Sequence, residues 1–290
     1  MIGLFTVFTP MLNIIDNIGS VDSRVILNIC GGAGAGKSHT SLSIARGLVD
    51  KGSEVCVVDT ENKAFTMRNH GNYSMDDMFK IIKYDPERGF SIKDMIECLG
   101  FLKSQKEIKV AVFDSFSSVY SDVGGMKDVV RKSSGSNLLQ KWGVFEDDIR
   151  ELTMLARTCG MHLILTTRAS ISYANKVRTV KYEQKEKFDY LYHTKVLIED
   201  RKFNIIRDNT GCFRVDWSGF NIGCCIRSWC GDAAFDIQSI VSDKINELKT
   251  LVANDGVRLR KLEDWLGDKV YDGDLLCKLN ELVNKERRVV

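Results

Sequence analysis

The residues with the most recognisable chemistry lie in a glycine-rich stretch that ends in lysine and serine. Gly31–Ser38 matches the pattern G-x-x-x-x-G-K-[ST] at every defined position. Glycines in such a loop let successive backbone N–H groups turn toward a phosphate, because no side chain stands in the way. Lys37 is expected to reach the β- and γ-phosphates, and the Ser38 hydroxyl to ligate Mg²⁺. The predicted nucleotide-binding residues are Gly31, Gly32, Ala33, Gly34, Ala35, Gly36, Lys37, Ser38 and His39.

The segments on either side of this loop predict that it connects a strand to the N-terminus of a helix, which is the setting of phosphate-binding loops. Residues 24–30 predict a buried strand, and residues 38–51 predict a helix whose N-terminus adds a favourable dipole. The alternative is a glycine-rich turn that matches the pattern by chance. The strand, loop and helix setting argues against that alternative and favours a bound nucleoside triphosphate.

Two further apolar strands end in carboxylates. Ile108–Asp114 delivers Asp114, which we predict to support Mg²⁺ beside the phosphate loop. Ser115 follows it instead of a glutamate, so the base that activates water must come from elsewhere. Glu54–Glu61 delivers Glu61, which we predict to orient or deprotonate the attacking water. Glu61 could instead be an ordinary polar strand end or a ribose-binding acid of a dinucleotide fold, but the loop is a triphosphate motif.

Strand-like and helix-like segments alternate through most of the chain, which predicts an α/β fold with a mostly parallel sheet. The predicted parallel strands are Val25–Cys30, Glu54–Asp59, Met78–Tyr84, Ile108–Asp114 and Met161–Thr167. Helical spacing separates them at Ile92–Lys103 and Asn137–Cys159.

Closely spaced short runs after Lys187 predict an antiparallel extension of the sheet. These runs are Tyr190–Glu199, Lys202–Arg207 and Cys212–Trp217, and a turn is predicted at Asp208–Gly211. From about Ser242 the leucine spacing becomes helical, which predicts a small helical C-terminal module. We therefore divide the chain into an ATPase core, residues 1–238 with an apolar N-terminal arm at 1–21, and a helical module, residues 239–290.

Composition and charge further narrow the classes of protein to which this chain could belong. The chain has 290 residues, 44% of them hydrophobic, and a net charge of +2, so binding to nucleic acid would have to come from local basic segments. Nine scattered cysteines suit reduced thiols and a cytoplasmic protein. Cys212, Cys224, Cys225 and Cys230 cluster, yet without a C-x-x-C pair buried thiols are favoured over a zinc site. The uncharged first fifteen residues are too interrupted to predict a membrane span.

Four segments, in this order and spacing, resemble the ATPase core of the RecA-like recombinases. They are Gly31–Ser38, Val57–Glu61, Val112–Ser115 and Leu163–Arg168. The compact RecA-like ATPases encoded by bacteriophages, some of which act in single-strand annealing or recombination, are the most similar group. The resemblance covers roughly residues 22–217. It implies ATP and Mg²⁺ as cofactors, hydrolysis of ATP, and a phage-encoded protein.

The resemblance also implies roles for particular residues. In that family the acid after the second strand is the catalytic glutamate, which supports Glu61, and a polar residue ending the fifth strand senses the γ-phosphate. Thr166 or Thr167 occupies that place, and we assign Thr167. The family holds nucleotide between subunits, with a basic residue supplied by the neighbour, and Arg207 is similar to that residue. Arg207 could equally be a surface arginine paired with a nearby carboxylate. The implied partner is a further copy of this chain, in a ring or a filament.

Two basic segments follow the fourth and fifth strands, where RecA-like proteins hold DNA. Ser121–Lys141 and Ser170–Lys187 are predicted to be flexible loops that carry cations for phosphates, with Tyr173 and Tyr182 available for stacking on bases. A lysine-rich loop can also be merely solvated. The candidate DNA-binding residues are Lys127, Arg131, Lys132, Lys176, Arg178 and Lys181.

Three functions remain open from the sequence. The first is a Mg²⁺-ATP-dependent RecA-like ATPase that binds single-stranded DNA in recombination, repair or replication. The second is a nucleotide-switched assembly or packaging ATPase that acts on a protein partner. The third is a small-molecule kinase. No Asn-Lys-x-Asp motif of the G proteins is present, which favours ATP over GTP.

Overall fold

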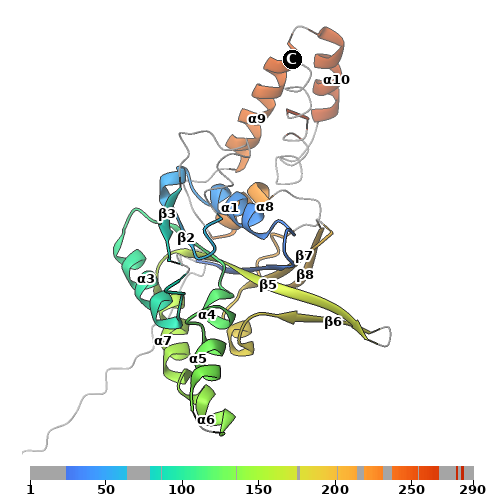
Figure 1. Cartoon of the computed structure of the whole chain (residues 1–290). Coiled ribbons are helices and arrows are strands. Elements are labelled where there is room, and N and C mark those ends of the chain that lie inside the picture. The colour runs from blue at the N-terminus through green and yellow to red at the C-terminus, as the bar shows by residue number, and fades with distance from the viewer. Residues whose placement is uncertain are drawn as a thin grey trace, which may run out of the picture.

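The chain folds around one mostly parallel, twisted β-sheet with helices on both faces (Figure 1). This computed structural model describes residues 24–63, 79–85, 87–134, 136–174, 177–200, 202–213, 219–230, 237–253, 255–267, 279 and 282–283. The strand order is β3-β2-β4-β5-β1-β7-β8, and β6 pairs with β5. The strands are β1 (Ile26–Gly31), β2 (Val55–Asp59), β3 (Lys80–Lys83), β4 (Val110–Asp114), β5 (His162–Ala174), β6 (Val177–Tyr182), β7 (Thr194–Glu199) and β8 (Lys202–Asp208).

Strand direction confirms the predicted fold class. The pairs that β1, β2, β3, β4, β5 and β7 make with one another are all parallel. The pairs β7–β8 and β5–β6 are antiparallel, and the first of them is the predicted extension of the sheet. Every residue of β1, β2 and β4 is buried, which explains why these strands are continuous apolar runs without an alternating pattern.

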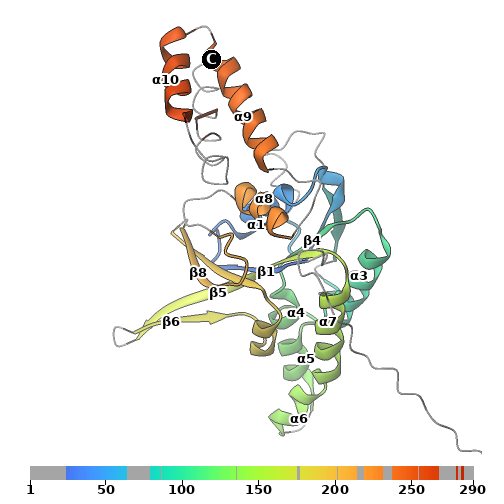
Figure 2. The same ribbon diagram turned by 180° about the vertical axis from the view of Figure 1, so that it is seen from behind.

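Helices α1 (Lys37–Gly47) and α8 (Gly219–Trp229) cover one face of the sheet. The other face packs against α3 (Ile92–Ser104), α4 (Ser118–Ser121), α5 (Met126–Lys132) and α7 (Glu146–Thr158), and the two views in Figures 1 and 2 agree on this layering. Each face has its own hydrophobic cluster, because side chains alternate between faces along every strand. Even-numbered residues of β5, such as Ile164, therefore face α1, and odd-numbered ones, such as Leu165, face α7.

Helix α8 packs unusually tightly on α1. A Cβ atom added at Gly223 would lie 2.2 Å from the carbonyl oxygen of Ile44 and 2.9 Å from the Cα of Gly47, so only glycine permits this approach. The buried guanidinium of Arg227 also pairs with Asp50 at 2.8 Å, just beyond α1. The sequence pattern did not predict α8, and Cys212 and Phe213 lie outside any strand, although a strand was predicted there.

The C-terminal residues form a separate helical cluster, as predicted. Helices α9 (Ile237–Val252) and α10 (Gly256–Leu266) stand away from the sheet, beyond α8 (Figures 1 and 2). Their apolar side chains make a cluster of their own, which includes Val241, Ile245, Leu248, Leu262 and Leu266. The division at residue 238 stays a prediction, and the predicted arm at residues 1–21 lies outside the described residues.

Three predicted segments differ from what the structure contains. Asn137–Cys159, predicted as one helix, is two: α6 (Leu138–Gly143) and α7. The predicted loop Ser121–Lys141 is largely helical and contains α5 and part of α6. The predicted loop Ser170–Lys187 is a β-hairpin of β5 and β6, followed by the short helix η3 (Glu186–Tyr190), and it projects away from the sheet in Figure 2. A further short helix, η2 (Gly52–Glu54), precedes β2.

Candidate functional site

The phosphate loop connects β1 to α1 in the geometry that its glycines permit. Gly34 and Gly36 adopt positive φ angles of 71° and 97°, which favour glycine because a side chain would be strained there. The Lys37 ammonium donates to the Gly32 carbonyl at 2.8 Å, so it lies along the loop. His39 is exposed in the first turn of α1. The predicted nucleotide-binding residues 31–39 therefore form one surface at the N-terminus of a helix.

Asp59 and Asp114 lie side by side at the carboxyl ends of β2 and β4. Asp114 is 4% exposed, and its carboxylate accepts hydrogen bonds from the hydroxyls of Ser38 and Thr166, the latter at 2.5 Å. Burial raises the pKa of the Asp114 carboxyl, the two hydroxyls oppose that shift, and Glu61 and Asp59 raise it further. The predicted metal residues, Ser38 and Asp114, are thus in contact.

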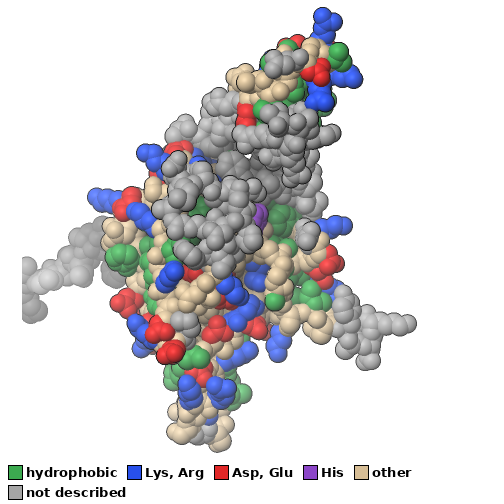
Figure 3. Space-filling view, turned by 45° about the horizontal axis from the view of Figure 1, so that its top comes forward, with side chains coloured by type: hydrophobic (Ala, Val, Ile, Leu, Met, Phe, Trp, Pro, Cys, Tyr) green, Lys and Arg blue, Asp and Glu red, His purple; other side chains and the backbone are tan. Residues whose placement is uncertain are grey.

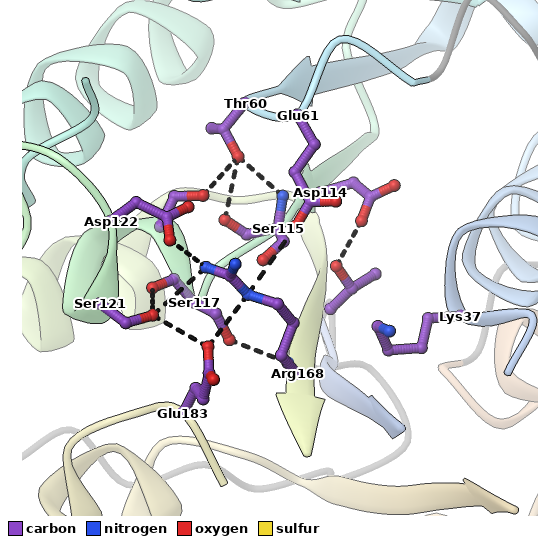
Figure 4. A network of polar contacts seen from close by, with 12 residues as sticks. Lys37, Thr60, Glu61, Asp114, Ser115, Ser117, Ser121, Asp122, Arg168 and Glu183 are labelled. Atoms are coloured by element: carbon purple, nitrogen blue, oxygen red, sulfur yellow. Dashed lines mark hydrogen bonds and ion pairs between the residues drawn. The ribbon is translucent and has the colours of Figure 1, made fainter. Parts of the chain in front are cut away.

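Lys37 supplies the positive charge opposite these carboxylates. Burial lowers the pKa of the Lys37 ammonium, while the negative charges of Asp114 and Glu61 act in the opposite direction. Lys37, Asp114 and Glu61 are therefore close enough to act on one another electrostatically, although they come from the start of α1 and from the ends of two strands (Figure 4). A bound triphosphate would add the anionic partner that a half-buried ammonium favours.

Glu61 lies immediately beyond β2, at the same edge of the sheet. Its side chain is 18% exposed, and its carboxylate pairs with Lys63 at 2.6 Å and lies 3.9 Å from Nε of Arg168. The Asp59 carboxylate accepts hydrogen bonds from the backbone N–H groups of Glu61 and Lys63, which fixes the turn that presents Glu61. Its role as the base stays a prediction, and its position beside Lys37 and Asp114 is compatible with that role.

Arg168, within β5, joins this site to two other parts of the molecule (Figure 4). Its guanidinium pairs with Asp122 at the end of α4 and, through Nε at 3.1 Å, with Glu183 at the end of the β5–β6 hairpin. It also donates to the Ser121 hydroxyl at 3.2 Å. The sequence placed Arg168 just beyond the predicted sensor, but it gave no signal for Asp122 or Glu183, because only the fold brings them together.

Thr60 and Ser115 make a second contact between strand ends that the sequence did not predict. The Thr60 hydroxyl accepts a hydrogen bond from the Ser115 backbone N–H at 2.8 Å and lies 2.9 Å from the Ser118 hydroxyl. The Ser115 hydroxyl is buried without a hydrogen-bond partner among the described residues. The only sequence signal for this pair is its place directly beside Glu61 and Asp114.

The assignment of the γ-phosphate sensor needs a correction. Thr167 is fully buried on the face of the sheet away from α1, and its hydroxyl lies 2.8 Å from Oδ1 of Asn28 and 3.3 Å from Oε1 of Gln184. Thr166 points to the α1 face, where it contacts Asp114. Because adjacent residues in a strand face opposite sides, only one of the two threonines can reach the site, and that residue is Thr166.

Arg207 lies far from the phosphate loop of its own chain. It is near the end of β8, opposite Lys195, and its guanidinium donates to the Asp189 carbonyl. Among the residues the structure describes, neither Asp208 nor Glu199 forms an ion pair with it. A contribution to the nucleotide site of a neighbouring subunit stays a prediction.

The candidate DNA-binding residues divide into two groups. Arg131 and Lys132 lie on α5, and both pair with Asp128 at 2.7 Å, so the two cations share one carboxylate. Lys127 lies over the ring of Tyr120 at 4.5 Å. On the hairpin, Arg178 pairs with Glu199 and Lys181 is exposed. Lys176 lies outside the described residues.

The face of the molecule in Figure 3 shows Lys and Arg side chains interspersed with Asp and Glu. This mixture agrees with the net charge of +2. Contact with DNA stays a prediction for both groups of residues.

The residues at the phosphate loop fit Mg²⁺ and a nucleotide. The hydroxyl of Ser38 and the carboxylate of Asp114 are oxygen ligands of the kind that Mg²⁺ prefers, and they are already adjacent. The loop offers backbone N–H groups and an ammonium for phosphates. Elsewhere, none of the described cysteines forms a disulfide, and within the described ranges no three His, Cys, Asp or Glu side chains are arranged to hold a metal ion.

Fold and site together define a P-loop nucleoside triphosphatase. A protein-family model described as an AAA domain matches residues 23–193, more than half of the chain and the segment that carries every strand end of the site. The chain therefore belongs to this AAA domain family, and its P-loop and nucleotide binding follow from that membership. No curated protein matched the chain. Over the described residues, no helix is both long enough and apolar enough to span a membrane.

Proposed function

We propose that this protein is a Mg²⁺-dependent ATPase of the RecA-like type that binds single-stranded DNA and acts in recombination, repair or replication. The observation that carries the proposal is Arg168, which contacts both the nucleotide site, near Glu61, and the base of the projecting hairpin, at Glu183. A change at the γ-phosphate that moved Glu61 would alter the partners of Arg168. The hairpin would then be held differently with and without ATP.

The chemistry of the proposed reaction rests on four side chains. Ser38 and Asp114 would hold Mg²⁺, which neutralises charge on the phosphates when bound. Lys37 supplies a cation to the phosphates, and its lowered pKa reflects the half-buried setting that strengthens such contacts. Glu61 orients and deprotonates the water, and Lys63 and Arg168 hold its carboxylate in place. Thr166 holds Asp114 and lies where a γ-phosphate sensor is expected.

The partner proposal rests on the hairpin in preference to α5. Lys181 on β6 is exposed and forms no ion pair within the described part of the chain, whereas Arg131 and Lys132 on α5 share Asp128. Tyr182 follows Lys181, but its ring is covered by the Lys195 ammonium at 3.7 Å, so phosphate contact is favoured here over stacking on bases. Self-association, with the nucleotide held between subunits, remains part of this proposal.

The test is ATP turnover with and without single-stranded DNA. We expect DNA to raise turnover, and we expect Lys181→Ala to reduce that increase while leaving turnover without DNA unchanged. Lys103→Ala, an exposed lysine on α3, is the matched control and should behave as wild type. DNA stimulation should also fall steeply with salt. Turnover that is indifferent to DNA would contradict the DNA proposal and leave the ATPase proposal standing.

One observation favours the second candidate, an ATPase that drives assembly with a protein partner. Apolar side chains are exposed on α6 and directly after it, where Leu138, Leu139 and Val144 are 60%, 86% and 64% exposed. Exposed apolar groups of this kind occur at protein interfaces. Sedimentation with and without Mg²⁺-ATP would show nucleotide-dependent association that Leu139→Ser abolishes. The small-molecule kinase stays an alternative from the sequence alone.

A further inference from the structure

A hollow of about 510 Å³ lies at the edge of the sheet opposite the phosphate loop. Ile26, the first residue of β1, lines it, whereas the phosphate loop follows Gly31, the last residue of the same strand. At ~3.3 Å per residue, the five steps between them span about 17 Å. The hollow is therefore distinct from the nucleotide site of its own chain.

Three arginines and one histidine, from four segments of the chain, converge on this hollow. Arg24 precedes β1, Arg157 lies on α7, His193 precedes β7 and Arg207 lies on β8. The described residues that line it include no aspartate or glutamate. This composition contrasts with the carboxylate-rich edge at the phosphate loop. A concave surface with several cations and no lining carboxylate attracts anions, because the cations repel one another until an anion enters.

Backbone carbonyls position the guanidinium groups of this hollow, and those of Arg157 and Arg207 are not neutralised by a described carboxylate. Arg24 donates through Nε to the Gly160 carbonyl at 3.0 Å, and Arg157 donates to the Tyr190 carbonyl at 3.3 Å. A third backbone carbonyl, that of Asp189, accepts from Arg207. Among the described residues, no carboxylate forms an ion pair with Arg157 or Arg207. A guanidinium has five N–H donors, so most of the donors of these two side chains remain available to a ligand.

His193 adds a donor to the same lining. Its Nδ1 accepts a hydrogen bond from the Ile26 backbone N–H at 2.9 Å, so the neutral ring carries its proton on Nε2. Burial lowers the pKa of the His193 imidazole, and the positive charges of Arg157 and Arg207 lower it further. The ring is therefore a neutral N–H donor near neutral pH, in a place where positive charge is concentrated.

We propose that this hollow is a second anion-binding site, which takes a small phosphate-bearing ligand of mononucleotide size. Arginine forks match the paired oxygens of a phosphate, and Arg157 and Arg207 offer two such forks at one site. The volume suits a compact ligand, since small-molecule pockets span roughly 300–1,000 Å³. Tyr190, which is 82% exposed and lines the hollow, offers a ring face for a planar group on that ligand.

The test uses the full chain with its phosphate loop saturated by Mg²⁺-ADP. AMP is then titrated calorimetrically at constant ionic strength, with inorganic phosphate as a second probe that lacks a base. We expect one additional AMP site per chain. Arg157→Ala should weaken this site at least about tenfold, because a charge-assisted contact is lost. The matched control is Arg150→Ala on the same helix, an arginine that pairs with Asp147 and lies outside this hollow, and it should leave the affinity unchanged.

A thermal measurement gives an independent readout. AMP should raise the melting temperature of the Lys37→Ala variant, whose phosphate loop is impaired, and this rise should disappear when Arg157→Ala is added. Without AMP, Arg157→Ala should keep or gain stability, since it relieves repulsion among the arginines. The proposal is overturned if neither AMP nor phosphate binds once the loop is filled, or if the Arg157 and Arg150 variants bind AMP equally.

Discussion

The two edges of the parallel sheet differ in the sign of the charge that they gather. At the carboxyl edge, Asp114 and Glu61 lie near Lys37, Asp59 lies beside Asp114, and burial raises the pKa of Asp114. At the amino edge, Arg157 and Arg207 line a hollow, and backbone carbonyls accept their hydrogen bonds. The first edge needs a cation and a polyphosphate to balance its charges, whereas the second needs an anion. The same short strands therefore separate two sites of different chemistry.

The largest expected effect is at the carboxyl edge. Glu61→Gln should lower ATP turnover by about 10²–10⁴-fold, because an amide cannot take a proton from water, while nucleotide affinity changes little. Glu107→Gln is the matched control, since Glu107 pairs with Lys80 near the amino edge and should not affect turnover. Single-turnover phosphate release measures both variants. Equal rates for Glu61→Gln and wild type would remove Glu61 from the mechanism.

Asp114→Asn separates the function of a buried carboxylate from its cost in stability. The substitution should abolish Mg²⁺-dependent turnover yet raise the melting temperature of the nucleotide-free protein, because it removes a charge that burial disfavours and keeps an acceptor for Thr166. The pKa of Asp114 is raised in the folded protein. The stability that protonated Asp114 contributes is therefore fully present below the pKa that this carboxyl has in the unfolded chain. It is lost as pH rises through the pKa of Asp114 in the folded protein.

Melting curves measured across pH, with and without Mg²⁺, check the direction in which stability changes with pH. Wild type should lose stability relative to Asp114→Asn as pH rises, and Mg²⁺ with nucleotide should restore it only in wild type. Asp147→Asn, at an exposed position on α7, is the control that should follow wild type throughout. A less stable Asp114→Asn protein at every pH would contradict the account.

The helix layer formed by α1 and α8 depends on one close contact between these two helices. Gly223→Ala should destabilise the fold by about 1–3 kcal/mol, because its Cβ would meet the Ile44 carbonyl at 2.2 Å and push α8 from α1. Gly100→Ala on α3 is the opposite case, since no atom outside its own helix lies within 4 Å, and it should gain up to about 1 kcal/mol. Urea unfolding compares the two, and equal shifts would show that the contact does not matter.

The smallest expected effect distinguishes the two threonines of β5. Thr166→Val should lower turnover by about tenfold, because Asp114 loses its hydrogen bond. Thr167→Val should leave turnover nearly unchanged and cost about 1 kcal/mol of stability, since it leaves Asn28 with an unmet contact in a buried network. Parallel turnover and melting measurements decide between them. The reverse pattern would restore Thr167 as the sensor.

Much of the carboxyl edge could be predicted from the sequence because its residues belong to local patterns. Gly31–Ser38 and Asp114 each follow an apolar strand, so topology alone brings them together. The choice between Thr166 and Thr167 failed because it depends on which face of β5 lies under α1. Helix α8 was missed because its contact with α1 is set by glycine and not by a regular apolar pattern.

The amino edge was hardly predictable. Arg24 and Arg157 lie far apart in the chain, and nothing in their neighbourhoods distinguishes them from solvated surface arginines. Arg207 was singled out by the family resemblance alone, and for a different role. The basic segment Ser121–Lys141 misled in the opposite direction, because two of its cations share the Asp128 carboxylate once α5 forms. Side-chain pairing after folding, and not local composition, determines which basic residues remain available.

The account's central claim is that the carboxyl edge hydrolyses ATP with Mg²⁺. Its most direct test is steady-state phosphate release by the purified chain and by Lys37→Ala, each with Mg²⁺ and with the metal chelated. We predict Mg²⁺-dependent release by wild type and a loss of at least about a hundredfold in Lys37→Ala, with Lys103→Ala unaffected. Release that persists in Lys37→Ala, or that does not need Mg²⁺, would contradict the account.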